Sequence, residues 1–261
     1  LILGEDGQKM SKSRGNSVNP DDILVEFGSD AFRLYEMFMG PLEMVKPWNT
    51  KGVEGVYRFL GRVWRMFIDE KSEQEFEQQL TVNPERGPEL LAGLKLNDAV
   101  GHSDATPEQL KVLHTCIKKV TEDMEHLRFN TAISAMMVFT NEASNWDIRP
   151  LSVMNDFMLL LAPFAPHIAE ELYAKANGGD STLAYQPWPS HDEAYLIEST
   201  IEMAVQVNGK LRDRIQIPAD MDKSDIERIA IESENVQRHT EGKNVKKVIV
   251  IPGKLVNIVA V

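Results

Sequence analysis

The sequence predicts a mainly α-helical protein in which a helix bundle is followed by a small α+β domain. Apolar side chains recur at three- and four-residue steps in long segments from residue 50 to about residue 173, which is the period of amphipathic helices. Near residue 200 short apolar strands begin, and they flank Asn208-Gly209 and Pro252-Gly253, which are dipeptides typical of tight turns. We expect divisions at residues 1–49, 50–190 and 191–261.

Composition indicates an ordinary globular protein with one large or two smaller cores. Of its 261 residues, 43% are hydrophobic and 26% are charged, which are usual proportions for such a protein. The formal net charge is −12, so indiscriminate binding of nucleic acid is unfavourable and any contact with RNA must be local.

Some other classes of protein and site are disfavoured by the residue types present. The single cysteine, Cys116, excludes a disulfide framework and a cysteine-rich zinc site, and we expect it to be a buried apolar side chain. His167 and His191 lack further ligands at metal-binding spacing, so no metal site is predicted. The sequence shows neither a basic-then-apolar leader nor an apolar run of membrane-spanning length, and we expect a cytoplasmic location with no membrane partner.

The first segment predicts a strand end and a tight turn that lead into a basic loop. Three cations and two hydroxyls follow within six residues, a composition suited to binding a polyphosphate. On composition alone, a solvated basic loop is the alternative. The residues of this loop are Lys9, Met10, Ser11, Lys12, Ser13 and Arg14, followed by Gly15 and Asn16.

Two short helices should support this loop. Asn19 and Pro20 predict the start of a helix that ends near Gly28, because asparagine is a favoured N-cap and proline a favoured first helical residue. Ser29 is then expected to cap a second helix, which ends at Gly40-Pro41.

A longer helix from Thr50 is predicted to have an apolar face and a basic face. The apolar stripe comprises Val53, Val56, Tyr57, Leu60, Val63, Trp64 and Phe67. The cations Lys51, Arg58, Arg62 and Arg65 are spaced by seven, four and three residues, which places them together on the opposite face at about 100° per residue. We expect this face to contact RNA phosphates, with a merely solvated face as the alternative.

The rest of the bundle is expected after a polar connection. Residues 70–103 predict loops with at most short helices. The acidic run at 70–77 predicts a solvated edge. Thr106-Pro107-Glu108-Gln109 predicts a capping box at the start of the next helix. Further helices are expected at 130–143, after Pro150 and at 168–173, and the helix after Pro150 is apolar enough to be central.

The final domain is predicted to contain a hairpin, a helix at about 224–231, and a second hairpin. Its cations should form a local positive surface in an otherwise acidic chain, which favours RNA contact over a plain solvated edge. They are Lys210, Arg212, Arg214, Lys243, Lys246, Lys247 and Lys254.

Residues 9–13 reproduce letter for letter the KMSKS signature loop of class I aminoacyl-tRNA synthetases. Seven further segments resemble bacterial leucyl-tRNA synthetases and extend the likeness along the whole chain: 40–43, 46–49, 56–60, 63–65, 162–172, 207–212 and 248–259. Such enzymes are several times longer and begin with a nucleotide-binding fold that carries a His-x-Gly-His type motif, which does not occur here. The chain therefore resembles their C-terminal part.

The resemblance implies a leucine–tRNA ligase that uses ATP with Mg²⁺, with leucine and tRNA(Leu) as the other partners of the full-length enzyme. Lys12 would be the main catalytic cation and Lys9 would assist it, while Met10, Ser11 and Ser13 complete the ATP-binding loop. The bundle would be of the anticodon-binding type, and the last domain would contact the outer corner of tRNA. Alone, the chain is expected to bind no ATP and to be inactive.

Two alternatives are also compatible with the sequence. One is a related class I synthetase of the valine, isoleucine or methionine type. The single cysteine disfavours a terminal cysteine-rich zinc module, and residues 207–212 and 248–259 favour the leucine type. The other is a free-standing tRNA-binding module without catalysis, which the intact signature loop disfavours.

Overall fold

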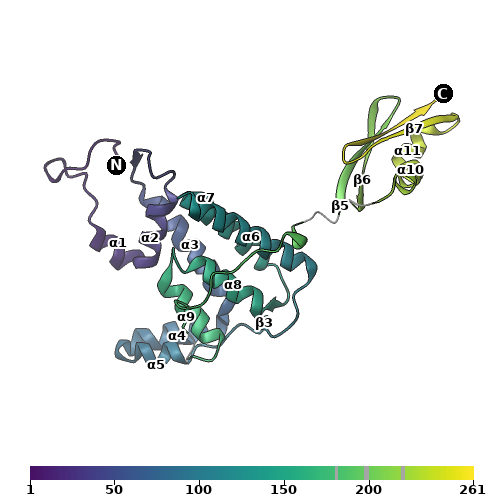
Figure 1. The fold of residues 1–261 in the computed structure, drawn as a ribbon. Helices are drawn as coiled ribbons and strands as arrows, with labels where there is room; N and C mark the ends of the chain where they lie inside the picture. Colours follow the sequence, from purple (N-terminus) through teal and green to yellow (C-terminus); the bar gives the residue numbers. More distant parts are fainter. Residues whose placement is uncertain (180–181, 197–199, 219–220) are drawn as a thin grey trace. The chain divides into compact units, whose positions relative to one another are not determined.

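The protein divides into two compact units, Leu1–Leu196 and Ile197–Val261. The computed structural model describes residues 1–179, 182–196, 200–218 and 221–261 (Figure 1). The first unit is helical and the second combines a sheet with helices, so the predicted mainly α-helical class with a small α+β domain is confirmed. Residues 1–49 share the hydrophobic core of the first unit with the bundle.

Short elements form the N-terminal part of the first unit. They are β1 (Ile2–Leu3), the 3-10 turn η1 (Lys12–Arg14), α1 (Pro20–Phe27), α2 (Ser29–Phe38) and β2 (Lys46–Pro47). The parallel pairing of β1 with β2 brings the chain on either side of the basic loop and α2 together. As predicted, Asn19 caps α1 by accepting the N–H of Asp21. The N-cap of α2 is Gly28 and not Ser29, which is the first residue of the helix. Gly28 adopts a φ of 82°, which is costly for other residues.

Helix α3 (Thr50–Phe67) buries a wider arc than the stripe read from its sequence. Most of the predicted stripe is buried, but Tyr57 is 51% exposed, while Phe59 and Met66 are buried instead. The reason is that α3 contacts α2, α7 and α9. A helix with several helical neighbours buries more than one stripe.

Residues 70–103 were expected to form loops with at most short helices, but they contain a long helix, so that prediction was wrong. It folds as α4 (Glu70–Val82), the turn η2 (Pro84–Arg86) and α5 (Gly87–Ala92), which form a hairpin in Figure 1. Asp69 begins α4 by accepting the N–H of Ser72 at 2.8 Å, and glutamate, glutamine and lysine are good helix formers. Few of its residues pack against the core, which is why its periodicity was weak.

Four helices complete the bundle. They are α6 (Pro107–Glu125), α7 (Phe129–Ala143), α8 (Leu151–Leu161) and α9 (Pro166–Ala176), accompanied by β3 (Val100–Gly101), β4 (Arg149–Pro150) and η3 (Glu193–Tyr195). The capping box of Thr106 and Gln109 at the start of α6 is confirmed. Helix α8 contacts α6, α7 and α9 and is central, as predicted. Cys116 is buried, and burial raises the pKa of its thiol to about 12.

The second unit is a four-stranded sheet in the order β6-β5-β8-β7 with two helices. Its elements are β5 (Thr200–Val207), β6 (Lys210–Pro218), α10 (Lys223–Glu232), α11 (Glu234–Thr240), β7 (Val245–Ile251) and β8 (Leu255–Ala260). The predicted turn between β5 and β6 places Asn208 and Gly209 at φ values of 51° and 77°, the conformation that this dipeptide favours. Helix α11 was not predicted.

No helix of the described residues is long and apolar enough to cross a membrane.

Candidate functional site

The basic loop has a defined shape that is set by hydrogen bonds. Ser11 and Ser13 hydroxyls lie 2.8 Å apart, and the N–H of Arg14 donates to the carbonyl of Ser11. Lys12–Arg14 form η1, which ends at Gly15 with a φ of 68°. The left-handed conformation explains the glycine at this position.

Asn16 holds the loop in shape through hydrogen bonds of its side chain, and we call its contact with Asp6 the Asp6–Asn16 latch. Its Oδ1 accepts the N–H of Ser11 at 2.8 Å, and its Nδ2 donates to the carboxylate of Asp6 at 3.1 Å and to the carbonyl of Lys9 at 3.3 Å. The pKa of Asp6 is lowered, first by the N–H of Gln8 and then by the amide of Asn16. Neither Asp6 nor the latching role of Asn16 was predicted from the sequence.

Gly4 allows this latch to close. A Cβ atom at residue 4 would lie 2.8 Å from Oδ1 of Asp6 and 2.9 Å from the carbonyl oxygen of Asn16. Both contacts are too short for a carbon atom. The close packing of Asp6 and Asn16 therefore requires glycine at this position.

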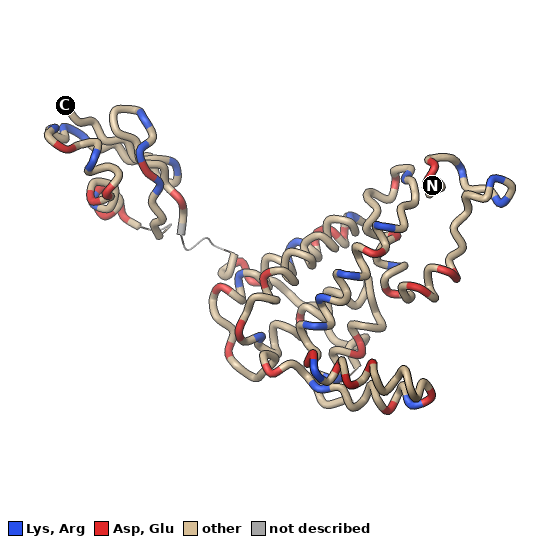
Figure 2. The backbone as a smooth tube through the Cα atoms, turned by 180° about the vertical axis from the view of Figure 1, so that it is seen from behind, with Lys and Arg blue, Asp and Glu red and all other residues tan. Residues whose placement is uncertain are grey.

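The cations of the loop are accessible to solvent and to a ligand. Lys9, Lys12 and Arg14 are exposed, and their side chains form no ion pair within the part of the chain that the structure describes. Met10 is half-buried and packs against the hydrophobic core. The loop thus presents ammonium, guanidinium and hydroxyl groups to solvent, a donor set that fits phosphate oxygens. Figure 2 shows basic residues at the tip of this loop.

Glu5 joins the loop to the start of α3. Its Oε1 accepts the N–H of Thr50 at 3.1 Å and the hydroxyl of Thr50 at 2.9 Å. These two bonds lower the pKa of Glu5, and Lys51 adds a smaller attraction. The basic loop and the basic helix are therefore parts of one structural unit.

The four cations predicted on α3 are placed differently. Lys51, Arg58 and Arg65 are exposed, whereas Arg62 is half-buried, and its Nε has no hydrogen-bond partner among the described residues. The exposed three are suited to contact a polyanion, and Arg62 is less accessible.

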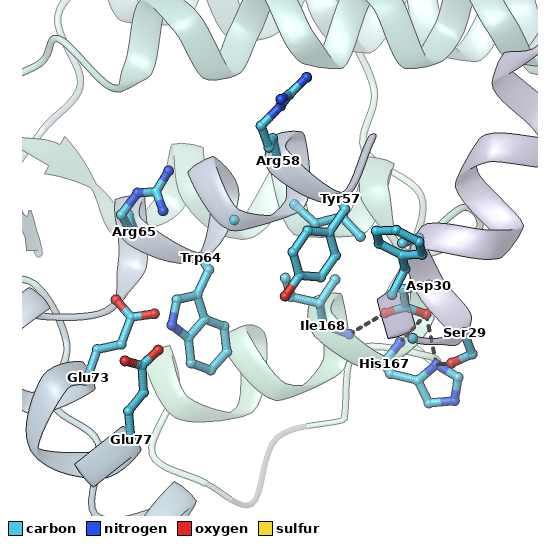
Figure 3. A pocket seen from close by; sticks show the side chains of 15 residues that line it. Ser29, Asp30, Tyr57, Arg58, Trp64, Arg65, Glu73, Glu77, His167 and Ile168 are labelled. Atoms are coloured by element: carbon cyan, nitrogen blue, oxygen red, sulfur yellow. Dashed lines mark hydrogen bonds and ion pairs between the residues drawn. The ribbon is translucent and has the colours of Figure 1, made fainter. Parts of the chain in front are cut away.

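A cavity of about 640 Å³ lies along α3 and includes two of these arginines. In Figure 3, Tyr57 and Trp64 form its centre, Arg58 and Arg65 lie along one rim, and Glu73 and Glu77 of α4 lie beside Trp64. Burial and the neighbouring Glu77 raise the pKa of Glu73, while Arg65 opposes that shift. This cavity could not be predicted from the sequence, because α4 was not expected.

Asp30 closes the far end of the cavity and anchors α2 to α9. Its Oδ2 accepts the N–H of Ile168 at 2.8 Å, and its Oδ1 lies 2.8 Å from Nδ1 of His167 (Figure 3). The Ser29 hydroxyl lies 3.3 Å from the same ring nitrogen. His167 is thus occupied by a structural contact. No group of three or more possible metal-ligating side chains occurs among the residues described.

Five of the seven cations predicted in the second unit lie toward one end of the sheet, but on opposite edges, whereas Arg214 is paired with Glu202 and Lys254 lies in the turn at the other end. Lys210 and Arg212 belong to β6, whereas Lys246 and Lys247 belong to β7, and these are the two outer strands. Lys243 donates to the carbonyl of His239 at 3.1 Å. Arg212 is half-buried with a partnerless Nε among the described residues. The expected single surface is therefore two separate basic edges.

Two protein-family models match parts of the chain, one within the first unit and one that extends from the first unit into the second. Residues 1–43 match the sequence model of tRNA synthetases class I (I, L, M and V). Residues 108–228 match the model of the anticodon-binding domain of tRNA ligase.

A solved structure is similar over the whole chain. It is the crystal structure of the ternary complex of Agrobacterium radiobacter K84 agnB2 LeuRS-tRNA-LeuAMS, with a TM-score of 0.65 and 29% sequence identity. The likeness covers 100% of this chain and 33% of that chain, so the present chain spans about a third of the length of its relative. The chain is therefore similar over its whole length to the C-terminal part of a leucyl-tRNA synthetase, and its two family matches are to class I tRNA synthetases of the I, L, M and V group and to the anticodon-binding domain of tRNA ligases.

Proposed function

We propose that the chain acts within a leucine–tRNA ligase, where its basic loop stabilises the phosphates of ATP and its two units bind tRNA(Leu). The observation that carries the proposal is the loop itself. Its backbone is held by the Asp6–Asn16 latch, while Lys9 and Lys12 are exposed and free of ion pairs with the described residues. Leucine, as the amino acid, is supported by the LeuRS neighbour at 29% identity.

The chemistry requires cations at this place. In the first step the carboxylate of leucine attacks the α-phosphorus of ATP, a new phosphorus–oxygen bond forms, and the bond to the departing pyrophosphate breaks. Negative charge grows on the pyrophosphate as that bond breaks. Lys12, assisted by Lys9, would stabilise the charge more strongly in the transition state than in the ground state.

The loop fits phosphate oxygens better than it fits a metal ion. Its free groups are ammonium, guanidinium and hydroxyl donors, and its nearest carboxylate, Asp6, is already hydrogen-bonded to Gln8 and Asn16. The Mg²⁺ that accompanies ATP would therefore be held by the nucleotide and by residues outside this loop. Met10, Ser11 and Ser13 would set the shape of the loop.

Contact with tRNA is assigned to the basic faces of both units. On α3, Lys51, Arg58 and Arg65 are exposed on one helical face, and guanidinium groups match phosphate oxygens well. In the second unit Lys210 on one sheet edge and Lys246 and Lys247 on the other would supply further backbone contacts. Local basic faces allow an acidic chain to bind RNA.

The decisive test is Lys12→Ala in the longer synthetase that also contains the nucleotide-binding fold. We expect the rate of ATP–pyrophosphate exchange to fall by about 100-fold, the usual effect of removing one transition-state donor, with tRNA affinity unchanged. Lys71→Ala, an exposed lysine on α4, is the control and should alter neither quantity. Equal losses of exchange rate and tRNA affinity would reject the assignment.

The same assay on the present chain alone should give no exchange activity. Activity from the chain alone would contradict the assignment of most of the ATP site to another part of the enzyme.

A further inference from the structure

We propose that the cavity along α3 holds one unpaired guanine nucleotide of a bound RNA strand, with its base between Tyr57 and Trp64 and its donor edge on the carboxylates of α4. This inference rests on the proposed RNA-binding function and deepens it. Eight of the fifteen residues that line the cavity belong to α3 and α4, which lie outside the ranges matched by the two family models, 1–43 and 108–228.

The cavity has the size and lining of a site for a small planar ligand. Its volume of about 640 Å³ lies within the range of about 300–1,000 Å³ that is usual for ligand pockets. Phe27, Leu60 and Ile168 contribute apolar surface. Arg65 lies near Glu73 at one end of the lining, and Arg58 lies farther along α3 (Figure 3).

Two aromatic side chains flank a glycine on the cavity side of α3. Tyr57, Gly61 and Trp64 are separated by four and three residues, so they lie on one helical face, with the aromatic residues about 10 Å apart along the axis. A Cβ at Gly61 would meet nothing closer than Nη1 of Arg65 at 3.7 Å, so the space between the rings is open. Tyr57 is 51% exposed although Phe27 supports it edge-on, with ring centroids 5.8 Å apart.

The glutamates select the kind of base. Glu73 and Glu77 lie beside Trp64 (Figure 3), and neither forms an ion pair with a described residue. A carboxylate has only acceptors and binds two parallel N–H groups best. Guanine presents two adjacent N–H donors on its pairing edge, whereas the other three bases place an acceptor beside each donor.

The two arginines of the cavity are placed to bind the phosphate backbone of the RNA strand. Arg58 and Arg65 lie on the rim above the aromatic rings, with Arg65 on the side of Glu73 and Arg58 farther along α3 (Figure 3). Phosphates on either side of an inserted base would meet these two guanidinium groups. Recognition of unpaired RNA bases commonly combines aromatic stacking, edge hydrogen bonds and basic backbone contacts.

The test measures binding of the whole chain to two labelled single-stranded tetranucleotides, UUGU and UUUU, by fluorescence anisotropy at low salt. We expect UUGU to bind about 10-fold more tightly, which is the lower range for one stacked base. Glu73→Gln should reduce the ratio of the two affinities to about one. Tyr57→Ala should weaken UUGU binding several-fold.

Two matched controls separate the cavity from general effects. Glu75→Gln removes one exposed charge from the same helix, and Tyr185→Ala removes a 91% exposed tyrosine elsewhere in the unit. Both should keep the wild-type preference. Circular dichroism checks that each variant is folded, and since Tyr57 and Glu73 are outside the buried core, we expect unchanged spectra.

Equal affinities of the wild-type chain for UUGU and UUUU would overturn the inference. A preference for UUGU that persists in both Glu73→Gln and Tyr57→Ala would also overturn the inference. Binding of a tetra-arginine peptide that is tighter than binding of UUGU and is abolished by Glu73→Gln would overturn it too, because the site would then select cations. Binding of tRNA(Leu) without any guanine preference would reject the cavity inference and leave the proposed function standing. A guanine preference in a chain that binds no tRNA would reject the proposed function and leave the cavity inference standing.

Discussion

Asn16 determines the shape of the basic loop through one side chain. Its amide contacts the carboxylate of Asp6, the carbonyl of Lys9 and the N–H of Ser11. Lys9 and Lys12 can therefore be exposed cations on a loop whose backbone is already arranged. A preformed loop loses less conformational entropy when it binds a ligand.

Asn16→Ala should loosen the loop while the core of the unit stays intact. We expect the amide of Ser11 to lose hydrogen-exchange protection and the pKa of Asp6 to rise toward its usual value, because one of its donors is removed. The exchange and an NMR titration of the Asp6 carboxyl measure these effects. Asn145→Ala, which removes only a bond within α7 and the following turn, is the control, and an unchanged Asp6 pKa in Asn16→Ala would refute the latch.

The cations of the loop could be predicted from the sequence, but the residues that hold the loop in shape could not. Lys9 and Lys12 stand in a recognisable motif, so they could be named at once. Asp6 and Asn16 are ten residues apart, and common polar residues at that distance give no local signal. Gly4 could have suggested a close approach, but not which side chains approach it.

At the scale of elements, α2 and α9 are joined by a polar contact that links distant parts of the chain. Asp30 is 8% exposed, and it accepts N–H groups from the first turn of α9. A carboxylate at this position satisfies donors that the helix itself leaves unpaired and favours the positive end of the helix dipole. The contact spans 138 residues of sequence, which is why it could not be predicted.

Asp30→Ala should destabilise the first unit by about 2 kcal/mol, the upper value for the loss of a helix cap. Urea unfolding followed by circular dichroism measures this change. Asp147→Ala, an exposed aspartate on the same unit, should change the unfolding free energy by less than about 0.5 kcal/mol. Equal effects of the two substitutions would show that Asp30 is not a structural cap.

Helices α3 and α4 show where periodicity succeeds and where it fails. The stripe on α3 predicted five of the core residues correctly, but it could not show that further neighbours bury Phe59 and Met66 and leave Tyr57 exposed. Helix α4 has few buried residues, so propensity and the Asp69 cap determine it rather than an apolar stripe. Together these two errors concealed the cavity.

For the whole molecule, the central physical question is how an acidic chain presents a local basic surface to the RNA partner that we propose. The net charge is −12, while unpaired basic residues gather on the N-terminal loop and one face of α3. Acidic residues are frequent on the α4–α5 hairpin (Figure 2). Such a distribution favours one orientation of an approaching polyanion.

Arg58→Ala should weaken tRNA binding and reduce the slope of log affinity against log salt by about 1, the effect of one lost phosphate contact. Filter binding at several salt concentrations measures the slope. Arg86→Ala is the matched control, because Arg86 is paired with Glu89 at 2.8 Å and should not contribute. An unchanged slope in Arg58→Ala would remove α3 from the interface.

The most direct test of the account is binding of the chain to a leucine tRNA and to an unrelated tRNA, each at two salt concentrations. If the two units carry recognition, the chain prefers the leucine tRNA and keeps that preference when salt is added. Weak binding that is equal for both tRNAs and disappears with salt would contradict the account, since the basic faces would then supply only backbone attraction.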